Sequence, residues 1–257
     1  MPLYPIVIVG HRGACGYAPE NTLSSFAKAI ECDVDMIEFD VRQCASGELI
    51  VFHDAKVDYL TNGHGYISEK TFDELRQLKV LGNEVIPTLS DVFDFVDRRV
   101  KLYIELKSPG IVQDILEIIE YYVHHKKWCY DDFLIASFDH VQLQEIKIAN
   151  NQIILAALMY GIPISFGACA SEITADIVCL DAEFITQRFV DDIHNRGMLA
   201  YVYTVNDKET YVRVIGYGVD GIITDYPGVI PPDKYPAATT PRSGYIYGES
   251  LLLRKDF

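Results

Sequence analysis

Positive charge is scarce in this sequence. Its 257 residues include 22 lysines and arginines against 37 aspartates and glutamates, which gives a formal net charge of −15 at pH 7. Nucleic acids and anionic membrane surfaces attract clustered lysine and arginine side chains. The deficit argues against a nucleic-acid partner and against stable membrane anchoring. An anionic substrate would need a local group of cations or a metal ion.

Closely spaced cysteines are also missing. The six cysteines include no pair of the CxxC kind, so their spacing indicates neither a zinc site nor a redox motif. Buried free thiols in a reducing cytosol are the expectation for such residues. Their positions are Cys15, Cys32, Cys44, Cys129, Cys169 and Cys179.

The N-terminal region has no long apolar run. The run at residues 6–9 ends at Gly10, His11 and Arg12, and no basic region precedes it. A membrane span needs about 20 apolar residues, and a signal peptide needs a basic region before its apolar stretch. The sequence therefore predicts a cytoplasmic protein.

The sequence does contain a regular alternation of strand and helix patterns. Eight strands joined by helical crossovers predict a (β/α)8 TIM barrel over residues 1–228, in one domain because no linker interrupts the alternation. A Pro-rich tail, residues 229–257, is expected to pack on the barrel. Asn21 and Thr22 are expected to cap the first helix. The strand patterns begin near residues 6, 36, 102, 133, 153, 177, 199 and 221.

A short antiparallel excursion is expected after the second strand. Residues 49–52 follow residues 36–41 too closely for a parallel crossover, which needs about a dozen residues. The return brings His53 back toward the level of Glu38 and Asp40. Pairing alone does not guarantee that His53 shares their face, and a bulge or loop would then have to turn it.

Polar residues gather at the carboxyl ends of the expected strands. Active sites of TIM barrels lie at this end, so several charges should converge on one mouth. The residues concerned are His11 and Arg12, Glu38 and Asp40, Glu105 and Lys107, Ser137, Thr204 and Asn206, and Asp225.

Three of these residues are carboxylates that face inward from two strands. Glu38 and Asp40 stand two apart, so both point to one face, and Glu105 ends the next parallel strand. Burying unpaired carboxylates costs several kcal/mol, and a divalent cation would resolve this. Oxygen ligands favour Mg²⁺ or Ca²⁺, while the nearby histidines leave Zn²⁺ or Mn²⁺ open.

The remaining charged groups suit phosphodiester cleavage. Of two histidines, His11 and His53, one can deprotonate a nucleophile while the other protonates the leaving oxygen. Arg12 and Lys107 can stabilise charge on the phosphoryl oxygens. The alternative is a structural network in which these two cations pair with the carboxylates.

Nine short motifs then give the chain a family resemblance. In order, over residues 6–228, they resemble the motif series of the glycerophosphodiester phosphodiesterase family, within the PLC-like phosphodiesterase superfamily. The motifs are His11-Arg12-Gly13, Pro19-Glu20-Asn21-Thr22, Glu38-Phe39-Asp40-Val41, His53-Asp54, Pro87-Thr88-Leu89, Glu105-Leu106-Lys107, Ser137-Phe138, Tyr203-Thr204-Val205-Asn206 and Asp220-Gly221-Ile222-Ile223-Thr224-Asp225-Tyr226-Pro227.

The resemblance implies a phosphoric diester hydrolase of glycerol and lipid metabolism. Its substrate would be a small glycerophosphodiester, cleaved to an alcohol and sn-glycerol 3-phosphate with one divalent ion, Mg²⁺ or Ca²⁺. The implied roles are an acid–base pair, three metal ligands and two phosphate contacts, which fall on His11 and His53, on Glu38, Asp40 and Glu105, and on Arg12 and Lys107.

The route implied by the family uses no protein nucleophile. The glycerol 2-hydroxyl attacks phosphorus, and water then opens the cyclic phosphate. The sequence pairs no serine or cysteine nucleophile with either histidine, which agrees with this route. We expect His53 to be the base and His11 the acid in the first step.

Two other functions stay open. A lysophospholipase D could use the same residues on a substrate with one acyl chain, and a non-catalytic relic could bind phosphate only. The sequence does not decide whether the chain forms a homo-oligomer. The lipid function needs an apolar groove at the mouth, and its expected exposed residues are Tyr59, Leu60, Tyr66 and Phe138.

Overall fold

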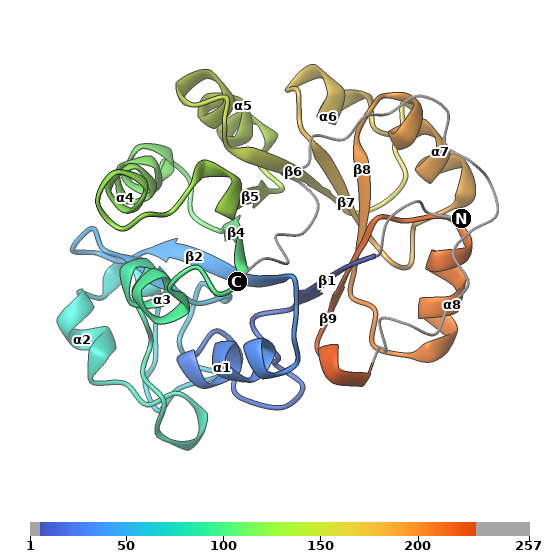
Figure 1. Cartoon of the computed structure of the whole chain (residues 1–257). Helices are drawn as coiled ribbons and strands as arrows, with labels where there is room; N and C mark the ends of the chain where they lie inside the picture. Colours follow the sequence, from blue (N-terminus) through green and yellow to red (C-terminus); the bar gives the residue numbers. More distant parts are fainter. Residues whose placement is uncertain (1–5, 230–257) are drawn as a thin grey trace.

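Strand β1 (Val7–Gly10) joins the two ends of the sheet. It pairs in parallel both with β2 (Met36–Gln43) and with β9 (Gly221–Thr224). The computed structural model describes residues 6–229 and confirms a closed barrel of eight parallel strands (Figure 1). The other strands of the barrel are β4 (Lys101–Leu106), β5 (Phe133–Ser137), β6 (Ile154–Met159), β7 (Ile177–Asp181) and β8 (Leu199–Tyr203).

The helices surround the strands (Figure 1). Thr22 caps the first of them by accepting a hydrogen bond from the Ser25 amide, so the cap is Thr22 and not Asn21. No helix within residues 6–229 is long and apolar enough to cross a membrane. The helices are α1 (Leu23–Glu31), α2 (Phe72–Arg76), α3 (Leu89–Val96), α4 (Val112–His125), α5 (His140–Ala149), α6 (Ala168–Glu172), α7 (Gln187–Asn195) and α8 (Lys208–Gly216).

The alternation along each strand separates two cores. On β2, Ile37, Phe39 and Val41 belong to the large core between strands and helices, whereas Met36 belongs to the core inside the barrel. Side chains two residues apart share a face of a strand. Glu38 and Asp40 therefore face the barrel interior together, as predicted.

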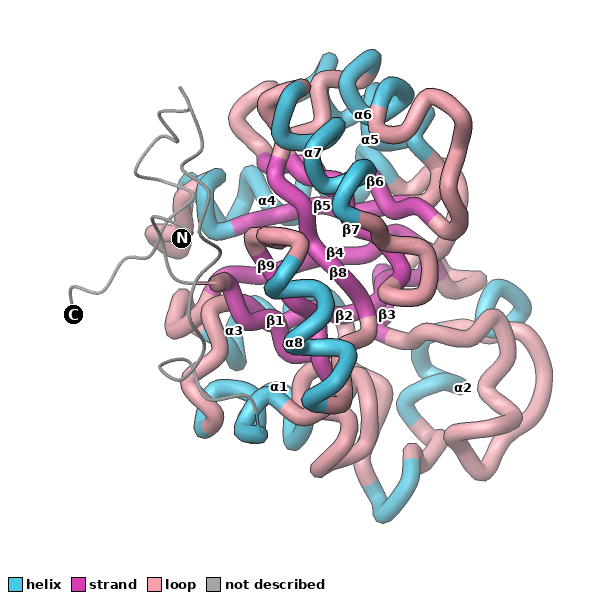
Figure 2. Tube along the Cα trace, turned by 90° about the vertical axis from the view of Figure 1, so that its right-hand side faces the viewer, coloured by secondary structure: helices cyan, strands magenta, loops and turns pink. Residues whose placement is uncertain are grey.

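The predicted antiparallel excursion is also confirmed. Strand β3 (Leu49–Val51) pairs antiparallel with β2. The chain then forms a segment, residues 52–88, that lies outside the ring of parallel strands and carries α2 (Figure 2). Together with Cys44 and Ile50, this segment forms a small apolar core that includes Leu60, and Leu60 is only 6% exposed. The expectation that Leu60 is an exposed groove residue is therefore wrong.

The C-terminal tail falls almost wholly outside the described residues. Only its first residue, Val229, is described, at the end of a short 3-10 helix, Pro227–Val229. The packing of residues 230–257 on the barrel stays a prediction.

Candidate active site

The turn after β1 is locked onto β2. The Arg12 amide donates to Oε2 of Glu38 at 2.7 Å, and the Gly13 amide donates to the Glu38 carbonyl at 3.1 Å. Gly13 has a φ of +89°, and a Cβ there would lie 2.7 Å from a backbone carbon of Ser25. Glycine is required because other residues neither favour this φ nor fit the space.

Three carboxylates from β2 and β4 form what we call the carboxylate cluster: Glu38, Asp40 and Glu105. Asp40 and Glu105 are register partners, and each of the three offers an oxygen within 4.8 Å of the others. Glu38 is 3% exposed and Asp40 1%. The structure thus brings together the three residues predicted as metal ligands.

Two cations approach this cluster. The Lys107 Nζ lies 2.5 Å from Oε1 of Glu105 and 3.4 Å from Oδ1 of Asp40. The Arg12 guanidinium is shared, with Nη1 2.7 Å from Glu20 and Nε 3.5 Å from Asp40. The ion pairs of the alternative structural network are therefore present in part.

The pKa values show that these two cations do not balance the cluster. Burial and the charges of its two neighbours raise the pKa of Glu38 well above its ordinary value. Burial and the charge of Asp40 raise the pKa of Glu105 to about 7. Burial opposes ionisation of Asp40 as well, but Lys107 and Arg12 outweigh it and lower the Asp40 pKa. Burial and mutual repulsion therefore disfavour ionisation of Glu38 and Glu105, whereas the two cations favour ionisation of Asp40.

The cluster fits one divalent cation. With Glu20, four carboxylates face the two cations Arg12 and Lys107, so full ionisation of all four would leave a deficit of two positive charges. Among the described residues, the buried Oε1 of Glu105 has no hydrogen-bond partner of ordinary geometry, although the Lys107 Nζ lies 2.5 Å away. An all-oxygen donor set of this kind suits Mg²⁺ or Ca²⁺.

His11 is held by a residue from the other end of the chain. Strand β9 places Asp225 beside it, and Nδ1 of His11 lies 2.5 Å from Oδ1 of Asp225. The Cys15 thiol donates to the same oxygen at 3.0 Å, and Asn206 donates to the other oxygen, Oδ2, at 2.6 Å. Burial opposes ionisation, but the hydrogen bonds from His11, Cys15 and Asn206 lower the pKa of Asp225 to about 2.

The side chains of His11, Cys15 and Asp225 form a second group, which we call the thiol cluster. The Cys15 sulfur lies 3.9 Å from Nδ1 of His11, a contact that the sequence did not predict. Burial raises the pKa of the Cys15 thiol far above its usual range, and the hydrogen bond to Asp225 and the negative charge of Asp225 raise it further. A protonated thiol is a poor nucleophile, so Cys15 is not an activated one.

His53 reaches the site from a loop. It follows β3 after Phe52, whose amide donates to the Asp40 carbonyl at 2.9 Å. Arg42 donates from Nε to the His53 carbonyl at 2.8 Å and from Nη1 to the Lys107 carbonyl at 3.1 Å. Burial is the largest influence on the His53 imidazole, and it lowers the pKa. His53 is therefore neutral at pH 7 and can accept a proton.

Sequence reasoning missed three residues that hold the site. Asn21 was expected to cap a helix, but its Nδ2 donates to Oδ2 of Asp40 at 2.9 Å. Arg42 ties the loop of His53 to the end of β4. Its position two residues after Asp40 on β2 was a usable signal, whereas nothing in the sequence pointed to Cys15 beside His11.

Of the other residues predicted to face the mouth, Ser137 does not do so, and that prediction is wrong. It is 1% exposed, and its hydroxyl accepts a hydrogen bond from the Asp139 amide. Asn206 supports Asp225 from both its side-chain atoms. All six cysteines are free thiols, but only Cys44 and Cys179 are buried.

Large exposed apolar side chains follow β5 and β6. We call Phe138, Tyr160, Ile162 and Ile164 the apolar rim, and their exposures range from 48% to 102%. The Phe138 ring centroid lies 5.9 Å from the Lys107 Nζ, so the rim borders the charged site. Tyr59 and Tyr66, which were also expected to be exposed, are 84% and 44% exposed on the segment outside the barrel.

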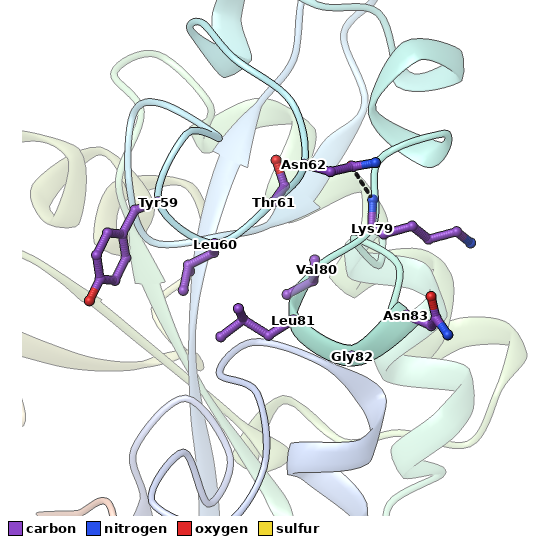
Figure 3. A pocket seen from close by; sticks show the side chains of 9 residues that line it. All are labelled: Tyr59, Leu60, Thr61, Asn62, Lys79, Val80, Leu81, Gly82 and Asn83. Atoms are coloured by element: carbon purple, nitrogen blue, oxygen red, sulfur yellow. Dashed lines mark hydrogen bonds between the residues drawn. The ribbon is translucent and has the colours of Figure 1, made fainter.

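That outer segment contains a separate hollow of about 380 Å³ (Figure 3). It is lined by residues 59–62 and 79–83, and it includes none of the predicted catalytic residues. The Lys79 amide donates a hydrogen bond to Oδ1 of Asn62 at 2.8 Å, which Figure 3 draws as a dashed line. The hollow is not the site of the predicted chemistry.

The fold and the site together define an α/β barrel whose mouth brings together two histidines, two cations and a cluster of carboxylates. Comparisons with known proteins agree. The model of the glycerophosphoryl diester phosphodiesterase family matches residues 11–229. A glycerophosphodiester phosphodiesterase of Caldanaerobacter subterraneus is 31% identical over 234 residues, which cover 86% of this chain and 94% of that protein. The chain belongs to the glycerophosphoryl diester phosphodiesterase family.

Two further relatives bear on the substrate. The structure of a phosphodiesterase from Oleispira antarctica in complex with the product sn-glycerol-3-phosphate has 27% sequence identity and a TM-score of 0.80, covering 88% of this chain and 95% of that chain. A lysophospholipase D from Rattus norvegicus is 23% identical over 260 residues, covering 85% of this chain and 83% of that protein.

Proposed function

We propose that this chain hydrolyses glycerophosphodiesters to an alcohol and sn-glycerol 3-phosphate. The observation that carries the proposal is the convergence of His11, Arg12, the carboxylate cluster and Lys107 at one barrel mouth. Family membership and the product bound to the Oleispira antarctica relative support this substrate class.

The carboxylate cluster would hold one divalent metal ion, with Mg²⁺ or Ca²⁺ as the best match to its oxygen donors. When bound, such an ion supplies Lewis-acid stabilisation of charge on the phosphoryl oxygens. Arg12 and Lys107 contribute to the same stabilisation as point charges and hydrogen-bond donors. Both would exchange part of their present carboxylate contacts for the phosphate.

The two histidines carry the protons. In the first step the 2-hydroxyl oxygen forms a bond to phosphorus, and the bond from phosphorus to the alcohol oxygen breaks. His53 takes the hydroxyl proton, and His11 gives a proton to the departing alcohol. In the second step water opens the cyclic phosphate, and the two roles reverse.

The electrostatics of the two histidines support this division of roles. Burial keeps His53 neutral and ready to accept a proton. The Asp225 carboxylate holds Nδ1 of His11, which leaves Nε2 as the nitrogen that can exchange a proton with a ligand. Intramolecular attack needs little beyond positioning and proton transfer, so Cys15 has no part in bond formation.

A metal and substrate panel tests the proposal. Glycerophosphocholine and glycerophosphoethanolamine should be cleaved with Mg²⁺ or Ca²⁺, and turnover should stop in excess EDTA and return when the metal is restored. An analogue that lacks the 2-hydroxyl should not react, whereas the glycerol cyclic phosphate should be hydrolysed. Turnover of the deoxy analogue would contradict the cyclic route. Failure to cleave any glycerophosphodiester would favour the phosphate-binding relic.

The apolar rim favours a second candidate, lysophospholipase D activity. Phe138 borders Lys107, so an acyl chain could lie along the rim while the phosphate meets the cations. The lysophospholipase D of Rattus norvegicus is a relative of this chain. Comparing kcat/KM for lysophosphatidylcholine and glycerophosphocholine decides between the two, and a higher value for the lysolipid would favour the second.

A further inference from the structure

The thiol cluster combines three different metal-ligating side chains in a place that the proposed reaction does not need for metal. His11 and Cys15 stand four residues apart on the turn after β1, where the Cys15 amide donates to the His11 carbonyl at 3.4 Å. This helical spacing puts both side chains on one side of the turn. Asp225 completes the group from the end of β9.

The three ligand atoms converge and can be reached from solvent. Oδ1 of Asp225 lies 2.5 Å from Nδ1 of His11 and 3.0 Å from Sγ of Cys15. The nitrogen and the sulfur are 3.9 Å apart. The His11 and Asp225 side chains are 20% and 24% exposed, so a small ion has a route inward. Asn206 holds Oδ2 of Asp225, which supports the ligating carboxylate from behind.

We propose that the thiol cluster binds a borderline divalent cation of the Zn²⁺ type, separately from the carboxylate cluster. Nitrogen, thiolate and carboxylate together are ligands that Zn²⁺ prefers, whereas Mg²⁺ and Ca²⁺ prefer oxygen alone. The two clusters therefore select different ions. One is an oxygen-only group on β2 and β4, and the other is a mixed group on β1 and β9.

The change in geometry that binding requires is small. Tetrahedral Zn²⁺ with such ligands holds the ligand atoms roughly 3.3–3.6 Å apart. The two short distances to Oδ1 of Asp225 are hydrogen bonds, and they open once the metal replaces their protons. The distance from Cys15 to His11, now 3.9 Å, closes slightly. The fourth position is left to water.

Metal binding displaces a proton from Cys15 and from Nδ1 of His11. The Cys15 thiol releases its proton to solvent when the thiolate binds the metal. The metal also replaces the proton on Nδ1 of His11, which is released to solvent, and the remaining ring proton is on Nε2. Because metal then occupies Nδ1, His11 can no longer exchange protons as the reaction requires. The metal is therefore inhibitory, a consequence that rests on the proposed function of His11.

Cobalt spectroscopy tests the site without reference to activity. Co²⁺ added to the metal-free protein should produce a near-ultraviolet thiolate-to-cobalt charge-transfer band. Cys15→Ser should lose this band, while Cys169→Ser, which changes a free cysteine on α6, should keep it. Asp40→Asn, which disables the carboxylate cluster, should also keep it. A band that persists in Cys15→Ser, or that is missing from the unaltered protein, would overturn the proposal.

Zinc inhibition tests the consequence. With Mg²⁺ or Ca²⁺ in excess, Zn²⁺ should inhibit the unaltered protein at concentrations at least roughly tenfold lower than those needed for Cys15→Ser, because loss of a ligand costs no less than loss of a residue that supports one. Cys15→Ser should retain basal turnover, because serine still donates to Asp225. Equal sensitivity of the two proteins would contradict inhibition through this site. If no glycerophosphodiester is cleaved at all, the proposed function fails, and the cobalt band alone decides the site.

Discussion

The two halves of the barrel mouth differ in chemistry. The half built from β9, β1, β2 and β4 carries the histidines, the cations and both clusters. The half built from β5 to β8 carries the apolar rim after β5 and β6, with Tyr203 edge-on to Phe138. Both halves rest on the same apolar core inside the barrel.

The difference shows how one scaffold can separate reaction from selection. Charges must converge within a few ångströms to act on one phosphorus atom, so they occupy neighbouring strands. An apolar wall stabilises a bound substrate through the surface area that it buries and needs no exact orientation. It can therefore lie on the other strands of the barrel. Substitutions in the charged half should therefore affect turnover, and those in the rim should affect preference between substrates.

Replacing either histidine should have the largest effect. His11→Ala and His53→Ala each remove a proton-transfer group, which contributes about 10²- to 10⁴-fold to the rate. We expect that loss in kcat for glycerophosphocholine, with an unchanged circular dichroism spectrum. Full activity in either variant would remove that histidine from the mechanism.

Asp225→Asn, in the charged half, should lower the free energy of unfolding by an amount that depends on pH. The pKa of Asp225 is lowered to about 2 in the folded protein, so its contribution to stability is present above the unfolded pKa of about 4 and is lost as the pH falls through that range. The contribution at pH 6 is about 2 kcal/mol. Urea unfolding from pH 6 downward should show the difference from the unaltered protein shrinking. If the difference in free energy of unfolding between the two proteins did not depend on pH, the lowered pKa of Asp225 would be wrong.

Arg42→Met should reveal a positioning residue. Arg42 touches the carbonyls of His53 and Lys107 but contributes no group to the reaction. Misplacing these two residues should lower kcat by about tenfold with a smaller change in KM. Arg42→Lys should restore part of the loss. A loss of stability without any change in kcat would indicate a purely structural role.

Phe138→Ala should have the smallest effect on the diester. The variant removes part of the apolar rim, so kcat/KM for glycerophosphocholine should change by less than about threefold. Any turnover of lysophosphatidylcholine should fall by about tenfold, because the acyl chain loses the Phe138 ring as a surface to cover. Equal changes for both substrates would erase the distinction between the two halves.

The element order could be predicted because the strands are buried on both sides. Their apolar runs, separated by amphipathic patterns, identified all eight barrel strands and the antiparallel β3. The inward direction of Glu38 and Asp40 followed from the two-residue repeat of a strand. Ser137 failed for the same reason, since it lies one residue after the inward-facing Ala136.

Irregular backbone was harder to predict. Asn21 stands before a helix, where asparagine is a common cap, yet its φ of 57° turns it to Asp40 while Thr22 caps. Leu60 lies in a polar stretch of sequence, yet a small apolar core outside the barrel buries it. The periodicity of the sequence does not predict contacts of this kind, because each contact depends on the conformation of a single turn.

The sequence alone determined the barrel, its family and the residue types at the mouth, because these follow from local periodicity and short motifs. Only the tertiary structure decided what surrounds each group. Asp225 lies 214 positions from His11, and closure of the barrel by β1 and β9 puts their side chains 2.5 Å apart. Cysteine spacing indicated no zinc site, and the proposed one exists only because that closure adds a carboxylate to a histidine and a thiol.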